Sequence, residues 1–402
     1  MTKTPNATSP GFRKLAAASA VAGLFAYALS VTVTPAAINQ ISPICHNSDA
    51  LVGWLFRVSM GGFFVFVLLG GRYSDKHGKL PMMLLGCVLM AVGSFGFARV
   101  STYPMALLMV LVTGAGGGFV EAIAMGVIAD VTSADKRTSV MNYAQVFFAA
   151  GAVIGPMSVT WLLAASTGYW RWAYVLTAVI CIVAALITAT AAAKREERPV
   201  GQEHRGEWKA LLKDRYVLML SLGILIYVAA ECGQASWLAK YFRYDRYLAT
   251  TEPIAAATVA LFWGGIGVGR YFATWTSRHL SDYAIICIAH GFALVCQVAL
   301  LVTHSTVFAL IAVPLLGFGL APGWPTIVSR ASALNPKQSG TVLGIVVSAG
   351  ALGAAIFPAL IGQVADYIGL RQALWICVAL LVANLCLFIP LLRQHQAQSE
   401  AP

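Results

Sequence analysis

A short basic loop between two apolar segments determines how this sequence is interpreted. It reads Gly71-Arg72-Tyr73-Ser74-Asp75-Lys76-His77-Gly78-Lys79. The segments on either side, residues 50–71 and 80–99, are mainly apolar, and each has the length of about 20 residues that a helix needs to cross a bilayer. The 71–79 loop therefore joins two predicted membrane-spanning helices.

The same pattern of apolar segments and polar connections extends along all 402 residues. The chain is 59% hydrophobic and 11% charged, whereas soluble domains are about 45–50% apolar and about 25% charged. Such long apolar segments exclude an outer-membrane barrel, whose strands alternate polar and apolar residues. The sequence therefore predicts an all-α integral membrane protein. The predicted spans are 15–38, 50–71, 80–99, 104–130, 139–164, 171–193, 216–242, 254–275, 283–303, 306–329, 339–364 and 371–392.

These twelve transmembrane helices divide into two six-helix halves at the polar segment 194–215. We therefore expect five parts, namely a tail 1–14, a bundle 15–193, a linker 194–215, a bundle 216–392 and a tail 393–402. Two related halves are typical of secondary transporters, whose substrate site lies between the halves near the membrane midplane.

Lys and Arg residues lie mainly at one end of the predicted spans. The formal net charge is +11, and the 71–79 loop, residues 136–137 and the linker 194–215 all contribute to the same side. Because Lys and Arg accumulate in cytoplasmic loops, we expect this side and both termini to face the cytoplasm, with the chain in the cell membrane. The charge is therefore topological and does not indicate nucleic-acid binding. The eight cysteines are scattered and give no disulfide framework or metal-binding spacing.

The 71–79 loop resembles the signature loop of the major facilitator superfamily, G-x-x-x-D-(R/K)-x-G-(R/K). Trp170-Arg171-Trp172 with Tyr174 is similar to a second motif of that family. The resemblance implies a transporter whose halves rock against each other, with an ion-pair latch at the cytoplasmic gate that stabilises the outward-open state. The residues expected at this gate are Gly71, Asp75, Lys76, Gly78, Lys79 and Arg137.

Two carboxylates, Glu121 and Glu231, lie deep within apolar spans. A carboxylate at such depth is costly, so it normally faces the bundle interior and handles an ion or a substrate. The span of Glu121 resembles the fourth span of the fucose:proton symporter group, where a Gly-rich run, here residues 114–118, precedes a glutamate that takes part in proton coupling. Met125 stands where that group often carries Asn. We expect both carboxylates to couple transport to a proton; the alternative for each is a hydrogen bond between helices only.

A polar face of one helix is predicted to contact the substrate. Spacings of four and three residues place Tyr227, Glu231 and Gln234 on that face, with Trp237 beside it. An aromatic plane next to mixed donors and acceptors suits a sugar. The alternative is a helix–helix contact.

Other spans supply further candidates for substrate contact. Tyr27 and Ser30 belong to a polar stripe along the first span, and Trp324 follows a predicted break at Pro322. Arg57 either extends to the membrane surface, or pairs with a buried glutamate or binds an anionic substrate such as a sugar acid.

The sequence therefore predicts an importer of a sugar or sugar derivative that is coupled to protons by alternating access. The alternative is a proton-coupled efflux antiporter of hydrophobic or cationic compounds, because residues 151–156 resemble the G-x-x-x-G-P element of drug:proton antiporters. No nucleophile–base pair or metal cluster is recognisable, so no enzyme, cofactor or metal is predicted. A carboxylate serves either H⁺ or Na⁺, and we expect H⁺. The expected partners are a small-molecule substrate, the coupling ion and the lipid bilayer, with the protein as a monomer.

Overall fold

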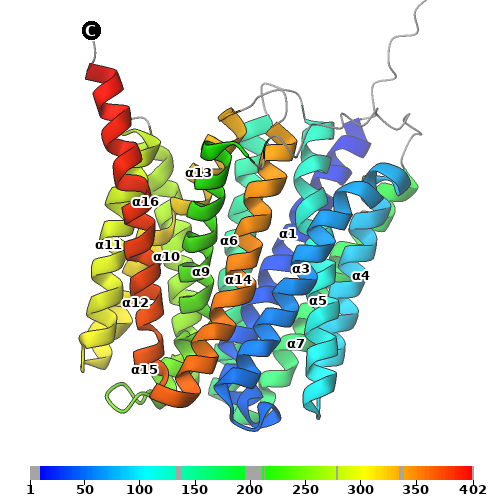
Figure 1. The fold of residues 1–402 in the computed structure, drawn as a ribbon. Helices are drawn as coiled ribbons and strands as arrows, with labels where there is room; N and C mark the ends of the chain where they lie inside the picture. Colours follow the sequence, from blue (N-terminus) through cyan, green and yellow to red (C-terminus); the bar gives the residue numbers. More distant parts are fainter. Residues whose placement is uncertain are drawn as a thin grey trace, which may run out of the picture.

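The computed structural model describes residues 10–132, 137–194, 211, 213–277, 279–334 and 339–400. Within these residues, twelve helices are long and apolar enough to cross a membrane, and they run side by side in one bundle (Figure 1). The all-α membrane architecture predicted from hydropathy is confirmed.

The first half of the chain contains six spanning helices and three short helical pieces. They are α1 (Pro10–Ala36), α2 (Ile38–Ile41), a 3₁₀ turn (Ser42–Cys45), α3 (Asp49–His77), α4 (Lys79–Phe97), α5 (Tyr103–Val131), α6 (Arg137–Ala165), a 3₁₀ turn (Thr167–Tyr169) and α7 (Trp170–Ala193).

The second half has the same plan with two interrupted helices. Its elements are α9 (Arg215–Tyr244), α10 (Glu252–Thr276), α11 (Asp282–Val302), α12 (Thr306–Leu320), α13 (Gly323–Leu334), α14 (Ser339–Ile368), α15 (Leu370–Ala373) and α16 (Trp375–Glu400).

Each predicted span corresponds to a helix, and the differences lie at the ends. Helix α1 already begins at Pro10, inside the predicted tail 1–14, because proline is well tolerated in the first turn of a helix. Helix α16 continues to Glu400 through most of the predicted tail 393–402, because no glycine or proline interrupts residues 391–400. The predicted break near Pro322 is confirmed, since α12 ends at Leu320 and α13 begins at Gly323.

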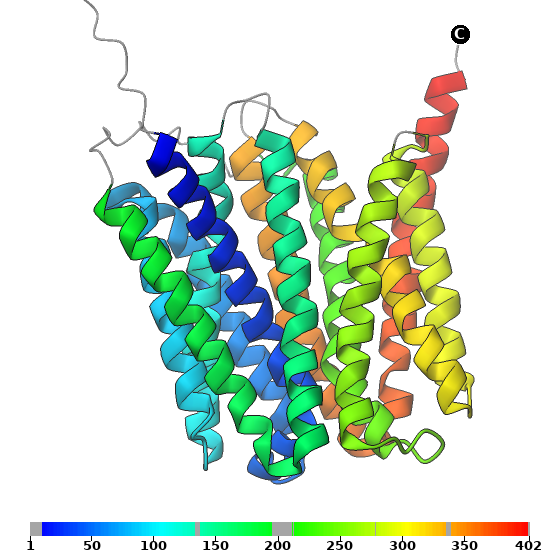
Figure 2. The same ribbon diagram turned by 180° about the vertical axis from the view of Figure 1, so that it is seen from behind.

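The start of α1 and the end of α16 lie on the same face of the bundle, which we call the terminal face (Figures 1 and 2). The 71–79 loop is also there, and most of it is the last two turns of α3 rather than a loop. The chain reverses between α3 and α4 at Gly78, whose φ of 93° favours glycine. The face at the other end of the helices is called the opposite face.

Contacts between the halves run mainly along two helix pairs, α3 with α14 and α6 with α10, and α1 adds contacts to α9 and α10. A methyl group at Gly53 of α3 would lie 2.8 Å from Cα of Ala359 in α14, so the two helices touch through their backbones. Buried apolar side chains form one continuous cluster from Leu29 in the first half to Trp237 in the second. The exact boundaries of the two predicted bundles stay a prediction.

Candidate functional site

Glu121 of α5 lies at the centre of the bundle beside Tyr27 of α1. The Tyr27 ring packs directly on Gly117, one turn before Glu121, where a methyl group would lie 2.6 Å from the ring. This close approach explains the Gly-rich run, because any larger residue would displace the tyrosine. Oε2 of Glu121 is buried and has no hydrogen-bond partner among the described residues.

Glu231 of α9 approaches the same centre from the second half. Its Oε1 accepts a hydrogen bond of 2.6 Å from Oη of Tyr227, one turn earlier on the helix. Gln234 is also buried, and its Oε1 accepts a hydrogen bond of 2.8 Å from Gln297 of α11. The predicted polar face of α9 therefore exists and is turned into the protein.

Arg270 of α10 links the two carboxyl groups electrostatically. Its positive charge acts on both Glu121 and Glu231, which come from different halves. The sequence analysis did not identify Arg270 as a site residue. The sequence does show an arginine within the apolar span 254–275. It does not show that this arginine lies near two carboxylates, because that depends on how the helices cross.

The first half contains a pocket between Tyr27 and the opposite face of the bundle. Both predicted residues of the α1 stripe, Tyr27 and Ser30, line it. The rest of the lining combines hydroxyl groups with apolar and aromatic side chains: Val31, Thr34, Leu55, Phe56, Ser59, Met60, Ser94, Phe97, Val110, Thr113, Gly114 and Tyr174. Such a lining is typical of sites for small organic molecules.

Three other predicted substrate contacts lie outside this pocket lining. Trp237 is fully buried, donates a hydrogen bond of 3.0 Å to the carbonyl of Pro358 and packs edge-on against Phe56. Its indole can therefore reach a ligand only after the halves separate. Trp324 packs against α14 at Gly350. The guanidinium of Arg57 lies 4.5 Å above the half-exposed ring of Trp54, and its role stays a prediction.

The predicted gate on the terminal face is described in part. Nζ of Lys79 forms an ion pair of 2.8 Å with Asp130 at the end of α5, and it also bonds the carbonyl of Gly126 at 3.3 Å. Lys76 is exposed. Gly71 lies within α3, and the side chains of Asp75 and Arg137 are outside the described part of the chain. The roles of these residues stay predictions.

A polar rim closes the opposite face between the halves. Asp366 at the end of α14 accepts hydrogen bonds from Oγ of Ser48 at 2.7 Å, from the amide of Asp49 at 2.7 Å and from the amide of Ala50 at 3.0 Å. A carboxylate of one half thus caps the first turn of α3 in the other. Lys240 of α9 adds an ion pair to Asp49.

Glu252 completes the polar rim from the start of α10. Its carboxylate accepts hydrogen bonds from Asn39 at 3.0 Å and from Gln40 at 2.8 Å, and it forms an ion pair with Arg243 at 2.7 Å. The polar rim therefore consists of residues 39–50 on one side and Lys240, Arg243, Glu252 and Asp366 on the other.

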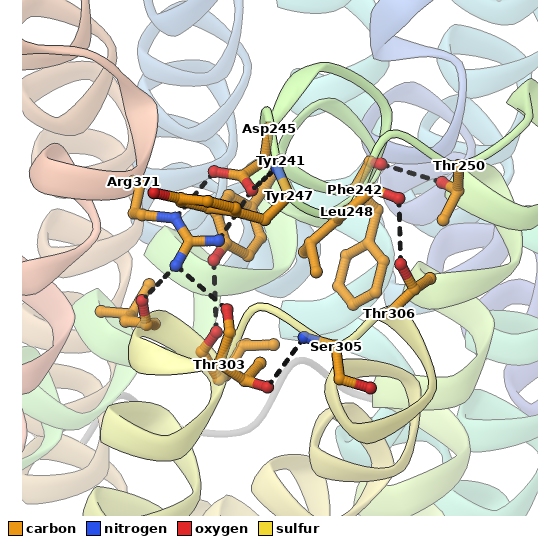
Figure 3. Close-up of polar contacts among 12 residues, drawn as sticks. Tyr241, Phe242, Asp245, Tyr247, Leu248, Thr250, Thr303, Ser305, Thr306 and Arg371 are labelled. Atoms are coloured by element: carbon orange, nitrogen blue, oxygen red, sulfur yellow. Dashed lines mark hydrogen bonds and ion pairs between the residues drawn. The ribbon is translucent and has the colours of Figure 1, made fainter.

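A further ion pair on the opposite face, between Asp245 and Arg371, joins three connections within the second half (Figure 3). Arg371 donates two hydrogen bonds of 2.7 Å to the carboxylate of Asp245 and further bonds to the carbonyls of Leu301 and Thr303. Burial of Asp245 favours its neutral form, but the hydrogen bonds from Arg371 outweigh this effect, so the pKa of Asp245 lies below its usual value.

Comparisons with known proteins agree with this architecture. The family description of the Major Facilitator Superfamily matches residues 16–336. A glucose/galactose transporter of Brucella abortus is 25% identical over 355 residues, which cover 84% of this chain and 83% of the relative. Multidrug resistance protein 1 of Bacillus subtilis is 24% identical over 353 residues, which cover 84% of this chain and 85% of the relative.

Solved structures share the same fold at low identity. A bacterial homologue of the human lysosomal transporter Spinster, in an inward-facing and occupied conformation, has a TM-score of 0.79 at 14% identity and covers 96% of this chain and 98% of its own. The E. coli fucose:proton symporter FucP has a TM-score of 0.64 at 17% identity and covers 92% of this chain and 97% of its own. The resemblance drawn from the 71–79 loop is thus confirmed for the fold and the family.

Proposed function

The chain belongs to the Major Facilitator Superfamily, and on that premise we propose that it imports a sugar or a sugar derivative together with a proton. It is a multi-pass membrane transporter and not an enzyme. One observation carries the proposal: two buried carboxyl groups, Glu121 and Glu231, come from different halves and share the charge of Arg270. Similarity to a glucose/galactose transporter supports sugars as the substrate class.

In this proposal Glu121 takes up and releases the proton. A carboxyl group with one buried oxygen that has no hydrogen-bond partner among the described residues is suited to change its protonation state when water reaches it. Glu231 with Tyr227 and Gln234 contacts the substrate, and the pocket at Tyr27 and Ser30 supplies hydroxyl groups from the other half. From the positive loops we infer that the terminal face lies in the cytoplasm and that the polar rim closes the outer side.

The test is the external pH when sugars are added to de-energised cells that express the protein. The panel contains hexoses, deoxyhexoses, amino sugars and sugar acids. We expect one class to raise the pH, and Glu121→Gln to abolish the rise, because an amide cannot carry the proton. Asp282→Asn is the matched control, since it removes a half-exposed carboxylate on the terminal face that pairs with Arg330 at 3.7 Å.

Efflux of hydrophobic compounds is the second candidate function. The multidrug resistance relative is 24% identical, close to the 25% of the sugar transporter, and apolar residues such as Met60 and Phe97 line the pocket. No response to any sugar, together with drug-dependent proton movement in inverted vesicles, would replace the sugar proposal with this one.

A further inference from the structure

Behind the Tyr227–Glu231 pair, two buried polar side chains, His290 and Asn384, form a chain of contacts that the proposed function does not use. Nδ1 of His290 in α11 lies 2.8 Å from Oδ1 of Asn384 in α16. The Nδ2 group of Asn384 donates a hydrogen bond of 2.8 Å to the carbonyl of Gly223 in α9. All three side chains, Tyr227, His290 and Asn384, are fully buried.

The hydrogen bonds fix the tautomer of His290. A backbone carbonyl only accepts, so the amide nitrogen of Asn384 must face Gly223 and its oxygen must face the imidazole. Nδ1 of His290 therefore carries the proton, and Nε2 is left with a lone pair. Nε2 is buried and has no hydrogen-bond partner among the described residues.

The ring of His290 in turn supports Tyr227. The two rings are parallel within 4°, with their centroids 5.5 Å apart. Gly323 at the start of α13 lies against both rings, so closely that a methyl group there would overlap the Tyr227 ring and lie 2.9 Å from Nε2 of His290. The tyrosine thus packs against the imidazole of His290 and the start of α13, and its hydroxyl donates to Glu231.

We propose that His290 is a positioning residue for the Tyr227–Glu231 pair, held in its plane and tautomer by Asn384. A flat apolar ring could fill the same space, but it could not be fixed by the amide of α16. The inference rests on the proposed function only in assuming that the carboxyl group of Glu231 takes part in transport. The other groups near Glu231 are Arg270 of α10 and the neighbouring Cys232, which in turn acts on Tyr27 of α1.

The test follows protonation of Glu231 and needs no substrate. The purified protein, in vesicles of phosphatidylcholine and phosphatidylglycerol, is titrated by infrared spectroscopy, and the carboxylic C=O band of Glu231 is assigned by its loss in Glu231→Gln. Tyr227→Phe removes a hydrogen bond donated to the carboxylate, so Glu231 should bind its proton about tenfold more tightly. His290→Phe should also make Glu231 bind its proton more tightly.

The decisive variant is the double substitution His290→Phe with Tyr227→Phe. If His290 acts through Tyr227, the pH midpoint at which the Glu231 band titrates shifts no further in the double variant than in Tyr227→Phe alone. The proposal would be overturned if the midpoint shifts of the two single variants add up in the double variant. It would also be overturned if His290→Phe leaves the midpoint unchanged. Because His290→Phe could fail to fold, Asn384→Leu is the second variant; it frees the imidazole, and the same shift is expected.

Gln297→Leu is the matched control, because it removes another buried amide from α11 and should leave the Glu231 band in place. ¹⁵N-histidine spectra add an independent readout, with the signal of His290 assigned by His290→Phe. We expect the Nδ1–H tautomer in the natural protein and its loss in Asn384→Leu; an Nε2–H tautomer would contradict the proposal. A transporter that ignores every sugar but gives these results would refute the proposed substrate and leave the positioning role intact.

Discussion

Arg270 is the residue on which the charge balance at the centre of the molecule depends. It acts on Glu121 from one half and on Glu231 from the other. Removing this cation would leave the two carboxyl groups at the centre without the positive charge that favours their ionised forms. Because both carboxyl groups interact with the same cation, protonation of one changes the proton affinity of the other.

We therefore predict that Arg270→Gln reduces substrate-dependent proton uptake at least about tenfold, while Arg270→Lys retains more activity because it keeps the charge. External alkalinisation in de-energised cells measures both variants. Arg330→Gln, an arginine of α13 on the terminal face, is the control and should behave like the natural protein. Equal uptake in the lysine and glutamine variants would show that the charge of Arg270 is not used.

The difference between Glu231 and Arg270 shows which parts of the site are readable from sequence. Tyr227 and Glu231 are four residues apart on one helix, so their shared face follows from helix geometry, and the structure confirms the contact between them. Whether Arg270 acts on two carboxylates depends on how α5, α9 and α10 are arranged in space. Residue spacing within one span does not predict that arrangement.

At the scale of elements, apolar length predicted every spanning helix, because a bilayer requires about 20 apolar residues from each. It did not predict where helices end beyond the membrane. Helix α16 runs on to Glu400, since its Arg, Gln, Ala and Glu residues favour helix in water as well. Helix α3 also runs on, to His77, and ends at Gly78. The break at Pro322 was readable because proline and glycine act locally.

The connections of the second half depend on the ion pair of Asp245 with Arg371. The side chains are 7% and 15% exposed, so loss of either partner should cost about 3–5 kcal/mol. We predict that Asp245→Asn lowers the unfolding temperature of the purified protein at pH 7. Asp214→Asn is the control, because Asp214 caps the other end of α9 and asparagine caps equally well.

The same pair gives a pH dependence with a definite sign. The pKa of Asp245 is lowered in the folded protein, although burial opposes this, because Arg371 donates hydrogen bonds to the carboxylate. The stabilisation is therefore fully present above the ordinary carboxyl pKa of about 3.9 and is lost as the pH falls below it. The natural protein and Asp245→Asn should differ most at pH 7 and converge in acid; a constant difference would contradict this account.

At the scale of the whole molecule, the structure is closed on the opposite face by the polar rim. Cys45 belongs to the rim segment 39–50 and is fully buried, and burial raises the pKa of its thiol to about 12, although Lys240 acts in the other direction. Because the thiolate is the reactive form, Cys45 should not react with a maleimide at pH 7 while the rim is closed.

Cys45 can therefore report opening of the opposite face. In a variant that keeps Cys45 as its single cysteine, we predict that Asp366→Asn or Glu252→Gln raises the labelling rate at least about tenfold, because each removes a carboxylate that joins the halves. Asp130→Asn is the control, since it breaks an ion pair on the terminal face and should not increase labelling. Equal rates in all variants would show that the rim does not hold the halves together.

The closure of the opposite face has two layers that respond to different physical conditions. The outer layer is the polar rim, in which Asp366 is exposed and its hydrogen bonds can be exchanged for bonds to water. Beneath it, Phe56 of one half packs edge-on against the buried Trp237 of the other. Dissolved salt screens the ion pairs of the rim, whereas cooling weakens the apolar contact below it. Ionic strength and temperature therefore act on separate layers of one closure.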